Sequence, residues 1–459
     1  MEEKIREEDY QECTGGSRKK EKINLGKDSV VKIFFHYAIP AIIGMIAMTS
    51  AGIIDGIFVG QVVGANALAA INISMPLFNV ISGIGVMIAM GGATLANIKR
   101  GEENLKESNN FFTITVFLIV AIGAITTIVA VFFSDGIANL LGAKSDTHEL
   151  VSNYVRIISI FIIPFLGAFT LDMFLRNDGF PVLPIVCTIS GSIINIVLDY
   201  VLIAKFNMGI TGAALATGVA QVIPVIAMML VILIKSSWKF VKPNFKFTII
   251  RDMLFNGSSE LLSNISVGVS GLIFNIIIMR EIGTMGVAAY SVANYAAMIA
   301  IAIFFGIATA INPGVSFNRG SRDFKRVLLF RKIGIIASLV CGVILAGGLL
   351  VFGDSIVYMF VGDNPQVRGI AVHIIKFYAV AMLIMGVNVV SSMYYTAINE
   401  PLISAIIAAS RSLVFLIGGV IFLPMIIGEN GIWTSIVFAE IATLFITIYF
   451  FKKKPMKIE

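Results

Sequence analysis

The chain has 459 residues, of which 57% are hydrophobic and only 14% are charged. Together with a mean hydropathy of +0.92, this composition excludes a soluble protein of that size and indicates a polytopic membrane protein. The net charge of +6 does not indicate a nucleic-acid partner, because the Lys and Arg residues are concentrated in short connections and at the two ends of the chain.

The chain begins with a polar segment, residues 1–28, that carries charges of both signs and lacks the apolar stretch of a signal peptide. We expect this segment to be a mobile cytoplasmic tail. The three cysteines, Cys13, Cys187 and Cys341, are far apart, so their spacing predicts neither a disulfide framework nor a metal site. No cofactor is expected.

Twelve apolar stretches follow, each long enough to cross a bilayer as a helix, which needs about 20 residues. Backbone exposed to lipid must satisfy its own hydrogen bonds, and the stretches are too long for barrel strands, so an all-α membrane protein is predicted. The predicted helices span residues 32–58, 67–97, 111–133, 148–173, 181–204, 210–234, 254–279, 286–316, 327–352, 367–395, 402–424 and 431–451.

The longest polar connection after the N-terminal tail lies between the sixth and seventh predicted helices, at residues 236–251. We expect it to separate an N-terminal lobe, residues 29–235, from a C-terminal lobe, residues 252–452, with residues 453–459 as a second tail. Basic residues are abundant in every second connection and in both tails. The positive-inside rule therefore predicts that both termini and the inter-lobe connection are cytoplasmic.

The two halves contain an internal repeat at a shift of about 219 positions. At this shift residues 63–70 (VGANALAA) align with residues 282–289 (IGTMGVAA), and far downstream Pro181 aligns with Pro401 at nearly the same shift. Because six is an even number of helices, each half begins and ends on the same side of the membrane. The repeats are therefore predicted to be parallel, with a substrate path between them, which is an architecture of transporters.

One carboxylate lies inside an apolar stretch that is expected to cross the membrane. Asp199 follows Asn195 by four residues in GSIINIVLDYVLI, residues 191–203. A charged side chain near the bilayer centre costs roughly 3 kcal/mol, so it normally faces a partner or a water-filled cavity. Positions i and i+4 share a helix face, so the amide and the carboxyl are predicted to hold a proton or a small cation. The alternative is a structural carboxyl satisfied by Asn195 and its helix neighbours.

Three segments in order, LRNDGFPVLP (residues 175–184), NIVLDY (195–200) and MGITGAALAT (208–217), resemble the fourth to sixth helices of the multidrug and toxic compound extrusion (MATE) transporters, and among them the MepA-like bacterial subgroup. The first predicted helix agrees, with Pro40 followed fifteen residues later by Asp55. GSSELLSN and INPGVSFNRG, at 257–264 and 311–320, are similar to family segments of the second half. The resemblance covers residues 30 to about 450.

The resemblance implies a V-shaped pair of six-helix lobes that exports amphiphilic, mostly cationic drugs and toxic compounds in exchange for inward H⁺ or Na⁺. It also implies a cation-coupling cluster in the N-terminal lobe, formed by Asp55, Asn195, Asp199 and Thr217, which would also be the ligands of Na⁺. We expect a multi-pass protein of the cell membrane that is surrounded by lipid, acts as a monomer and binds no nucleic acid.

Two further positions are candidates for a functional role. Glu260 in the seventh predicted helix is a candidate for recognising substrate charge, although snorkelling of its side chain towards water explains it equally well. Pro40 is a candidate hinge, or else a tolerated helix proline. Relatives often carry a carboxylate in the tenth helix, where this chain has Asn388 as its strongest polar residue. A cation site in that helix is therefore not expected.

Two pairs of opposite charge are predicted inside the lobes. Asp172 lies four residues before Arg176 near a helix end, so an ordinary i, i+4 ion pair explains both residues. Arg411 and Glu440 lie deep in the eleventh and twelfth helices and are predicted to pair with each other in a structural role.

Other functional classes explain the sequence less well. A flippase for lipid-linked precursors, the main alternative, requires more charged groups in its cavity, and transport of a labelled lipid headgroup would identify it. A membrane-embedded enzyme is not expected, because no His, Asp or Glu cluster with catalytic or metal spacing lies at a helix end. The two-lobe repeat suits alternating access better than a channel.

Overall fold

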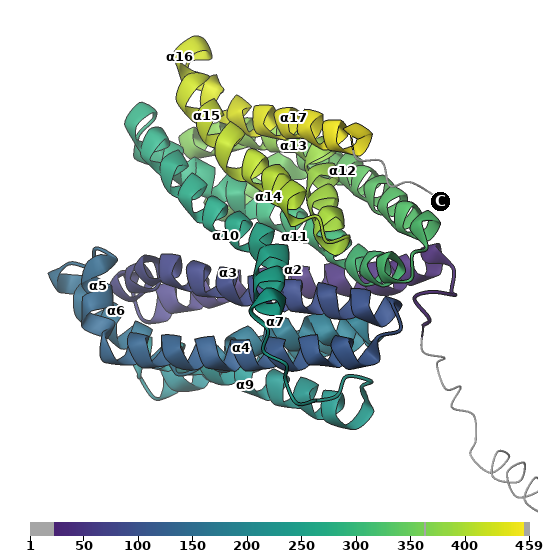
Figure 1. The fold of residues 1–459 in the computed structure, drawn as a ribbon. Helices are drawn as coiled ribbons and strands as arrows, with labels where there is room; N and C mark the ends of the chain where they lie inside the picture. The colour runs from purple at the N-terminus through teal and green to yellow at the C-terminus, as the bar shows by residue number, and fades with distance from the viewer. Residues whose placement is uncertain (1–22, 362–363, 454–459) are drawn as a thin grey trace, which may run out of the picture.

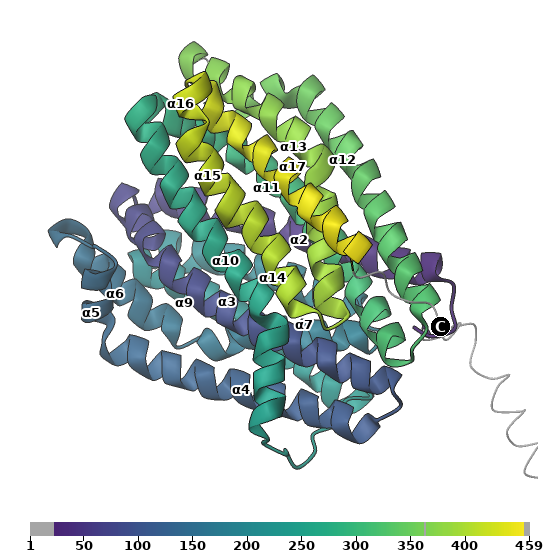
Figure 2. The same cartoon turned by 45° about the horizontal axis from the view of Figure 1, so that its top comes forward.

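The structure is a computed structural model that describes residues 23–361 and 364–453, in which all regular secondary structure is helical. The helices form two bundles, seen from two directions in Figures 1 and 2. The first bundle contains α2 (Val30–Val62), α3 (Ala65–Gly101), α4 (Leu105–Phe132), α5 (Ser134–Leu140), α6 (Ser145–Ser159), α7 (Ile162–Asn177), α8 (Val182–Asp199), η1 (Tyr200–Lys205) and α9 (Gly209–Lys235). The second contains α10 (Phe247–Glu281), α11 (Thr284–Gly320), α12 (Phe324–Val361), α13 (Pro365–Ala397), α14 (Pro401–Ala409), η2 (Ser410–Val414), α15 (Phe415–Phe422), α16 (Pro424–Ile427) and α17 (Asn430–Lys453).

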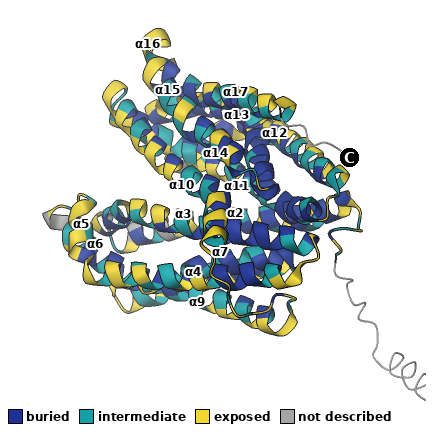
Figure 3. Ribbon diagram, viewed as in Figure 1, coloured by how far each residue is buried: buried dark blue, intermediate teal, exposed yellow. Residues whose placement is uncertain are grey.

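The number of membrane spans agrees with the sequence. Within the described ranges, eleven helices are long and apolar enough to cross a membrane, and the bent pair of α6 and α7 makes a twelfth. The prediction of an all-α protein with twelve spanning helices is therefore confirmed. Exposed positions lie mainly along the outer faces of the bundles (Figure 3). Large apolar side chains such as Phe132 and Leu233 are among the exposed residues, as expected for faces that contact lipid.

The fourth predicted helix is not straight, because α6 and α7 meet at an angle of 51°. Pro164 lies in the first turn of α7, and a proline there removes a backbone donor and breaks the preceding helix. The Thr127 hydroxyl donates a hydrogen bond of 2.7 Å to the carbonyl oxygen of Ser159, at the end of α6. The short helix α5, which was not predicted, follows α4 directly.

The fifth and eleventh predicted helices each contain a π-helical segment. The first, η1, begins directly after Asp199, and the second, η2, contains Arg411. Single π-helical turns inside α-helices are frequent at functional sites. Apolar composition could not reveal them, because the extra residue changes the register of the backbone and leaves the hydropathy unchanged.

The seventh helix begins earlier than predicted. α10 starts at Phe247, inside the stretch 236–251 that was expected to be a connection. Its first turn precedes the charged residues Arg251 and Asp252, and Ile249 and Ile250 in that turn pack against the apolar core of the first bundle. This packing gives the polar-looking segment a buried face and stabilises the helix there.

The first helix of each bundle packs against the second helix of the other bundle. α2 contacts α11, and α10 contacts α3. Two glycines bring α3 and α10 together: a Cβ on Gly257 would lie 1.9 Å from the Met87 carbonyl oxygen, and a Cβ on Gly91 would lie 2.0 Å from that of Met253. Only glycine fits at both positions, because the obstacle is backbone that cannot move aside. Such close backbone approach is the usual means of helix association in membranes.

α3 and α11 also cross each other near their C-terminal ends. Asn97 on α3 donates hydrogen bonds of 2.9 Å to the carbonyl oxygen of Pro313 and 2.7 Å to the hydroxyl of Ser316 on α11. Asn97 and Ser316 are 219 positions apart, the shift of the internal repeat, so this contact lies on the axis that relates the bundles. The bundles touch at this end and diverge towards the end that carries α5 and α16 (Figure 1).

The segment between α9 and α10 is fixed to the first bundle by Asp178, in the turn between α7 and α8. The carboxylate of Asp178 pairs with Arg100 at 2.9 Å and accepts hydrogen bonds from the Ser236 hydroxyl and from the backbone and hydroxyl of Ser237. Burial alone would raise the pKa of Asp178, but the Ser237 hydrogen bonds and the Arg100 charge outweigh it and lower that pKa below its ordinary value. Farther along, the Lys239 backbone donates to Asn109 of α4.

The segment that precedes α2 is fixed in the same way, but to the second bundle. Arg326 of α12 donates to the carbonyl oxygens of Leu25 and Asp28, and Asn318 of α11 also donates to Leu25. Each bundle therefore holds the backbone that leads into the other bundle's first helix. Both attachments lie at the end where the bundles touch, which we call the closed end.

Candidate functional site

A cavity of about 400 Å³ lies between the bundles. Its wall comes mainly from α2, α3, α7, α8 and α9 of the first bundle, and α10, α11 and α13 complete it from the second. Methionine and phenylalanine dominate the apolar lining, which includes Met45, Met48, Met90, Phe165, Phe169 and Phe305. Flexible thioethers and aromatic faces adapt to ligands of different shape, and the volume is that of a drug-sized binding site.

Two of the four predicted coupling residues meet in the wall of this cavity. Asn195 on α8 and Thr217 on α9 both line it, and the Asn195 amide lies 3.5 Å from the Thr217 hydroxyl. This distance is at the long limit for a hydrogen bond, so the contact is weak. Both groups retain capacity to bind something else.

The other two coupling residues are the predicted carboxylates. Asp199, one turn beyond Asn195, is 1% exposed and is not among the described residues that line the cavity, so it lies deeper in the first bundle. Asp55 lies on α2, but its side chain is outside the described part of the structure. Among the side chains that are described, no group of three or more His, Cys, Asp and Glu residues could hold a metal ion. The four-residue Na⁺ site therefore stays a prediction.

Pro40 lies inside α2, which continues as one helix from Val30 to Val62. The structure shows this helix in one form, so the proposed hinge also stays a prediction. A proline in a helix removes one backbone hydrogen bond, which is what a hinge requires.

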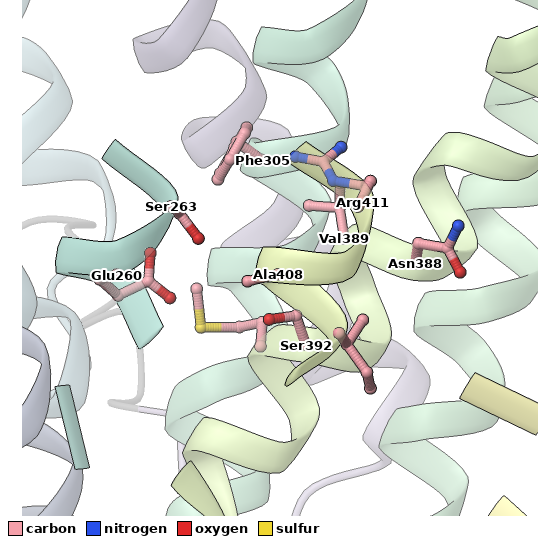
Figure 4. A pocket seen from close by; sticks show the side chains of 10 residues that line it. Glu260, Ser263, Phe305, Asn388, Val389, Ser392, Ala408 and Arg411 are labelled. Atoms are coloured by element: carbon pink, nitrogen blue, oxygen red, sulfur yellow. The ribbon is translucent and has the colours of Figure 1, made fainter. Parts of the chain in front are cut away.

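Glu260 is the carboxylate that the second bundle presents to the cavity. It is buried on α10, it lines the central cavity, and it also lines a smaller pocket of about 20 Å³ together with Ser263 and Arg411 (Figure 4). A buried side chain that lines the cavity does not reach the membrane surface, and its role in recognising substrate charge stays a prediction.

Arg411 and Glu440 form the predicted pair, with 3.5 Å between the Arg411 guanidinium and the Glu440 carboxylate. Asn388 donates to this carboxylate at 2.8 Å and accepts a hydrogen bond of 3.1 Å from Thr447. The amide in the tenth helix is thus engaged in holding a buried ion pair.

Asp172 and Arg176 form the predicted i, i+4 pair at 2.5 Å, but they also line the central cavity. Their place in the cavity wall was not predicted from the sequence. The cavity-lining positions of α7 lie on one face of the helix and are Phe165, Ala168, Phe169, Asp172, Met173 and Arg176. The ion pair lies on the same face of α7 as Phe165 and Phe169, so its charged groups and these aromatic rings line the same cavity.

Known proteins share the fold of this chain, and a family model matches each of its two halves. The MatE family model matches the chain twice, at residues 40–201 and 261–421. The chain is 25% identical over 415 residues to the multidrug export protein MepA of Staphylococcus saprophyticus, covering 89% of each, and 25% identical over 432 residues to MepA of Staphylococcus aureus, covering 90% of this chain and 92% of that protein. A solved MATE multidrug resistance transporter in an outward-facing conformation matches with a TM-score of 0.88 and 21% identity, over 95% of this chain and 98% of that one.

Proposed function

Because the chain belongs to the MatE family, we propose that it is a multidrug efflux transporter that exports amphiphilic, mostly cationic compounds in exchange for H⁺ or Na⁺. Its fold and its relatives are those of transporters and not of enzymes. The observation that carries the proposal is the cavity between the bundles, which combines a Met- and Phe-rich wall with the buried carboxylate of Glu260. That lining suits flat cations of varied shape.

The proposed mechanism is a competition between ion and drug for two states of the transporter. Ion binding at Asp199, Asn195 and Thr217, with Asp55, would remove negative charge from the first bundle and weaken the attraction for a bound cation. An ion that binds one state more tightly than the other shifts the equilibrium by that difference in affinity. Asn195 and Thr217 line the cavity, which supports a coupling cluster near enough to act on the charge of a bound ligand.

We place the closed end of the molecule in the cytoplasm, in the cell membrane, with both termini there. Basic residues at the ends of α3 and α11, Lys99, Arg100 and Arg319, support this orientation. A membrane-impermeant thiol reagent applied to intact cells should label Asn139→Cys and leave Lys239→Cys unlabelled, in a background without Cys13, Cys187 and Cys341. Both positions are exposed, so the reverse pattern would contradict the orientation.

Ethidium efflux tests the function and the choice of ion together. Inverted membrane vesicles that contain the protein are given either a pH gradient or a Na⁺ gradient, and ethidium accumulation is followed by fluorescence. We expect one of the two gradients to drive accumulation and vesicles without the protein to show none. Transport of a labelled lipid headgroup, without ethidium transport under either gradient, would instead identify a lipid flippase.

A further inference from the structure

A half-buried arginine at the closed end of the second bundle lies on aromatic rings and has no acidic partner among the described residues. Arg331, two turns into α12, lies with its guanidinium 4.5 Å from the ring centre of Phe451 in α17 and 5.4 Å from that of Tyr394 in α13. No carboxylate within the described ranges forms an ion pair with this guanidinium. The rings hold the guanidinium in place, and its positive charge is left for a ligand.

The opposite end of the same two helices, α12 and α13, provides a contrast. Arg368 in α13 lies 5.2 Å from the ring centre of Tyr358 in α12, but its guanidinium also pairs with the carboxylate of Asp354. The charge of Arg368 is therefore balanced within the protein, whereas the described residues provide no such partner for Arg331. Stacking on a ring is compatible with an ion pair, so the guanidinium of Arg331 can still bind an anion.

A second arginine without an acidic partner among the described residues lies close to the first. Arg319, in the last turn of α11, lies 5.4 Å from the ring centre of Phe324, the first residue of α12. Phe324 and Arg331 are seven residues apart and so share one face of α12. The charge of Arg319 also acts on the hydroxyl of Tyr394, on whose ring Arg331 stacks. Two guanidiniums on neighbouring helices therefore offer forked N–H donors, which match the oxygens of a phosphate group.

The surface around these arginines combines positive charge with apolar faces. Lys332 on α12 and Lys452 on α17 are exposed at this end. One turn nearer the middle of each helix, Ile336 and Ile448 are also exposed. An inorganic anion would use only the charges, whereas a phospholipid places its phosphate beside the basic residues and its acyl chains on the apolar side chains. The order of basic and then apolar side chains along both helices therefore favours a lipid.

We propose that Arg331 and Arg319 bind the phosphate group of an anionic phospholipid at the closed end of the second bundle. Its acyl chains lie along the outer faces of α12 and α17, and its headgroup connects α11 with these two helices. The bound lipid therefore stabilises the end at which Arg326 and Asn318 hold the segment before α2. The site is separate from the central cavity, none of whose described lining residues belongs to it. It does not depend on the proposed transport function.

Titration of the lipid-depleted protein tests the proposal. Purified protein in a neutral detergent receives dioleoylphosphatidylglycerol, dioleoylphosphatidylcholine or inorganic phosphate, and the unfolding temperature is measured at each concentration. A ligand that binds the folded state raises this temperature in a saturable way. We expect phosphatidylglycerol to do so, and we expect the other two additions, at equal concentrations, to leave the unfolding temperature nearly unchanged.

Variants of the two arginines separate lipid binding from packing. Arg331→Gln should weaken the apparent affinity for phosphatidylglycerol roughly fivefold or more, since it removes one basic contact to the headgroup. Arg331→Lys keeps the charge but not the fork and should recover part of the affinity. Arg319→Gln should cause a similar loss, and it tests the same site should Arg331→Gln fail to fold. Arg368→Gln is the matched control, because Arg368 stacks on a ring in the same bundle but is paired with Asp354, and it should leave the affinity unchanged.

The affinity is obtained from the lipid-dependent change in unfolding temperature, so a variant that is less stable without lipid still reports on the site. Equal stabilisation by the two lipids, equal stabilisation by inorganic phosphate, or a loss of affinity in the Arg331→Gln and Arg319→Gln variants no larger than in Arg368→Gln would overturn the proposal. None of these measurements uses an ion gradient or a drug, so failure of the proposal is distinguishable from failure of the transport function.

Discussion

In the first bundle, α7 ends in the ion pair of Asp172 and Arg176 on the cavity wall, whereas the matching end of α13 in the second bundle carries hydroxyl groups. The 220-position shift that aligns Pro181 with Pro401 aligns Asp172 with Ser392 and Arg176 with Thr396. The Thr396 hydroxyl lies 2.7 Å from that of Ser404 and 3.1 Å from that of Ser259, so these groups satisfy one another. The same backbone position is therefore charged in one bundle and neutral in the other.

Two other positions of the repeat are charged in the second bundle and uncharged in the first. At the same shift Arg411 aligns with Gly191, and Glu260 aligns with Pro40. A Cβ on Gly191 would already lie 3.0 Å from the Ala220 carbonyl oxygen, so the first bundle has no room for an arginine there. The two halves therefore share the arrangement of their helices, but these charged residues are not repeated between them. We infer that the bundles divide the work, with ion coupling in the first and recognition of cationic charge in the second.

The largest effect is expected for Asp199→Asn, which tests the coupling assigned to the first bundle. The substitution keeps the shape of the side chain but removes its ability to change charge. Gradient-driven ethidium efflux from vesicles should fall to background while the protein still inserts and binds drug. Asn195→Ala, which removes only an amide, should shift the apparent ion affinity and leave some transport. Wild-type efflux by Asp199→Asn at every pH from about 6 to 8 would assign Asp199 a structural role.

A smaller and more selective effect is expected for Glu260→Gln, which tests the second bundle. Loss of one charged contact in the cavity should weaken binding and export of cationic drugs by roughly tenfold and leave neutral drugs nearly unchanged. Export assays with a matched cationic and neutral pair measure the difference. Equal loss for both drugs would show that Glu260 takes part in coupling, and the division between the bundles would then be wrong.

Arg411 and Glu440 should affect stability more than transport. Arg411→Gln leaves the Glu440 carboxylate buried without its cation, which typically costs about 3 kcal/mol. Arg411→Gln/Glu440→Gln removes both charges and should recover most of that loss. Thermal unfolding in detergent, followed through the fluorescence of the two buried tryptophans, Trp238 and Trp433, measures both effects. A single variant as stable as the wild type would show that the pair contributes little.

The smallest effect is expected for Asp178→Asn, which loosens the inter-bundle segment by about 1–3 kcal/mol. The native pKa of Asp178 is lowered by its Ser237 and Arg100 partners, so its stabilising contribution is complete above the unfolded value of about 4 and disappears as the pH falls through the native value. The difference in Tm between wild type and variant should therefore be constant from about pH 5 to 7 and shrink in more acidic buffer. A difference that does not depend on pH would contradict this assignment.

Much of the fold was predictable because the apolar stretches are long and the repeat is visible. The twelve spans follow from hydropathy, and the shift between residues 63–70 and 282–289 predicts parallel bundles, which the double match of the family model supports. The break before Pro164, the π-helical segments and the early start of α10 were not predicted. The break follows from the proline itself, the π-helical segments from a local change of helical register and the early start of α10 from tertiary contacts, and hydropathy reports none of these.

The site was predicted less completely. The pairs Asp172 with Arg176 and Arg411 with Glu440 were foreseen from spacing and depth, but the exposure of the first pair to the cavity was not. Which face of α7 meets the cavity depends on how the bundles are turned, and a sequence of uniformly apolar helices leaves that rotation open. The assignment of Asp199 to ion coupling rests on its place in an apolar stretch, on its spacing to Asn195 and on the family resemblance, and that of Asp55 rests on the resemblance; both remain predictions.

The division of work between the bundles is tested most directly by counting ions and drug together. Purified protein in liposomes is given a drug gradient, and ethidium movement and ion flux are recorded in the same sample for wild type, Glu260→Gln and Asp199→Asn. We predict that Glu260→Gln transports ethidium more slowly with an unchanged number of ions per ethidium, and that Asp199→Asn shows no coupled ion flux. A changed ratio in Glu260→Gln, or a wild-type ratio in Asp199→Asn, would contradict it.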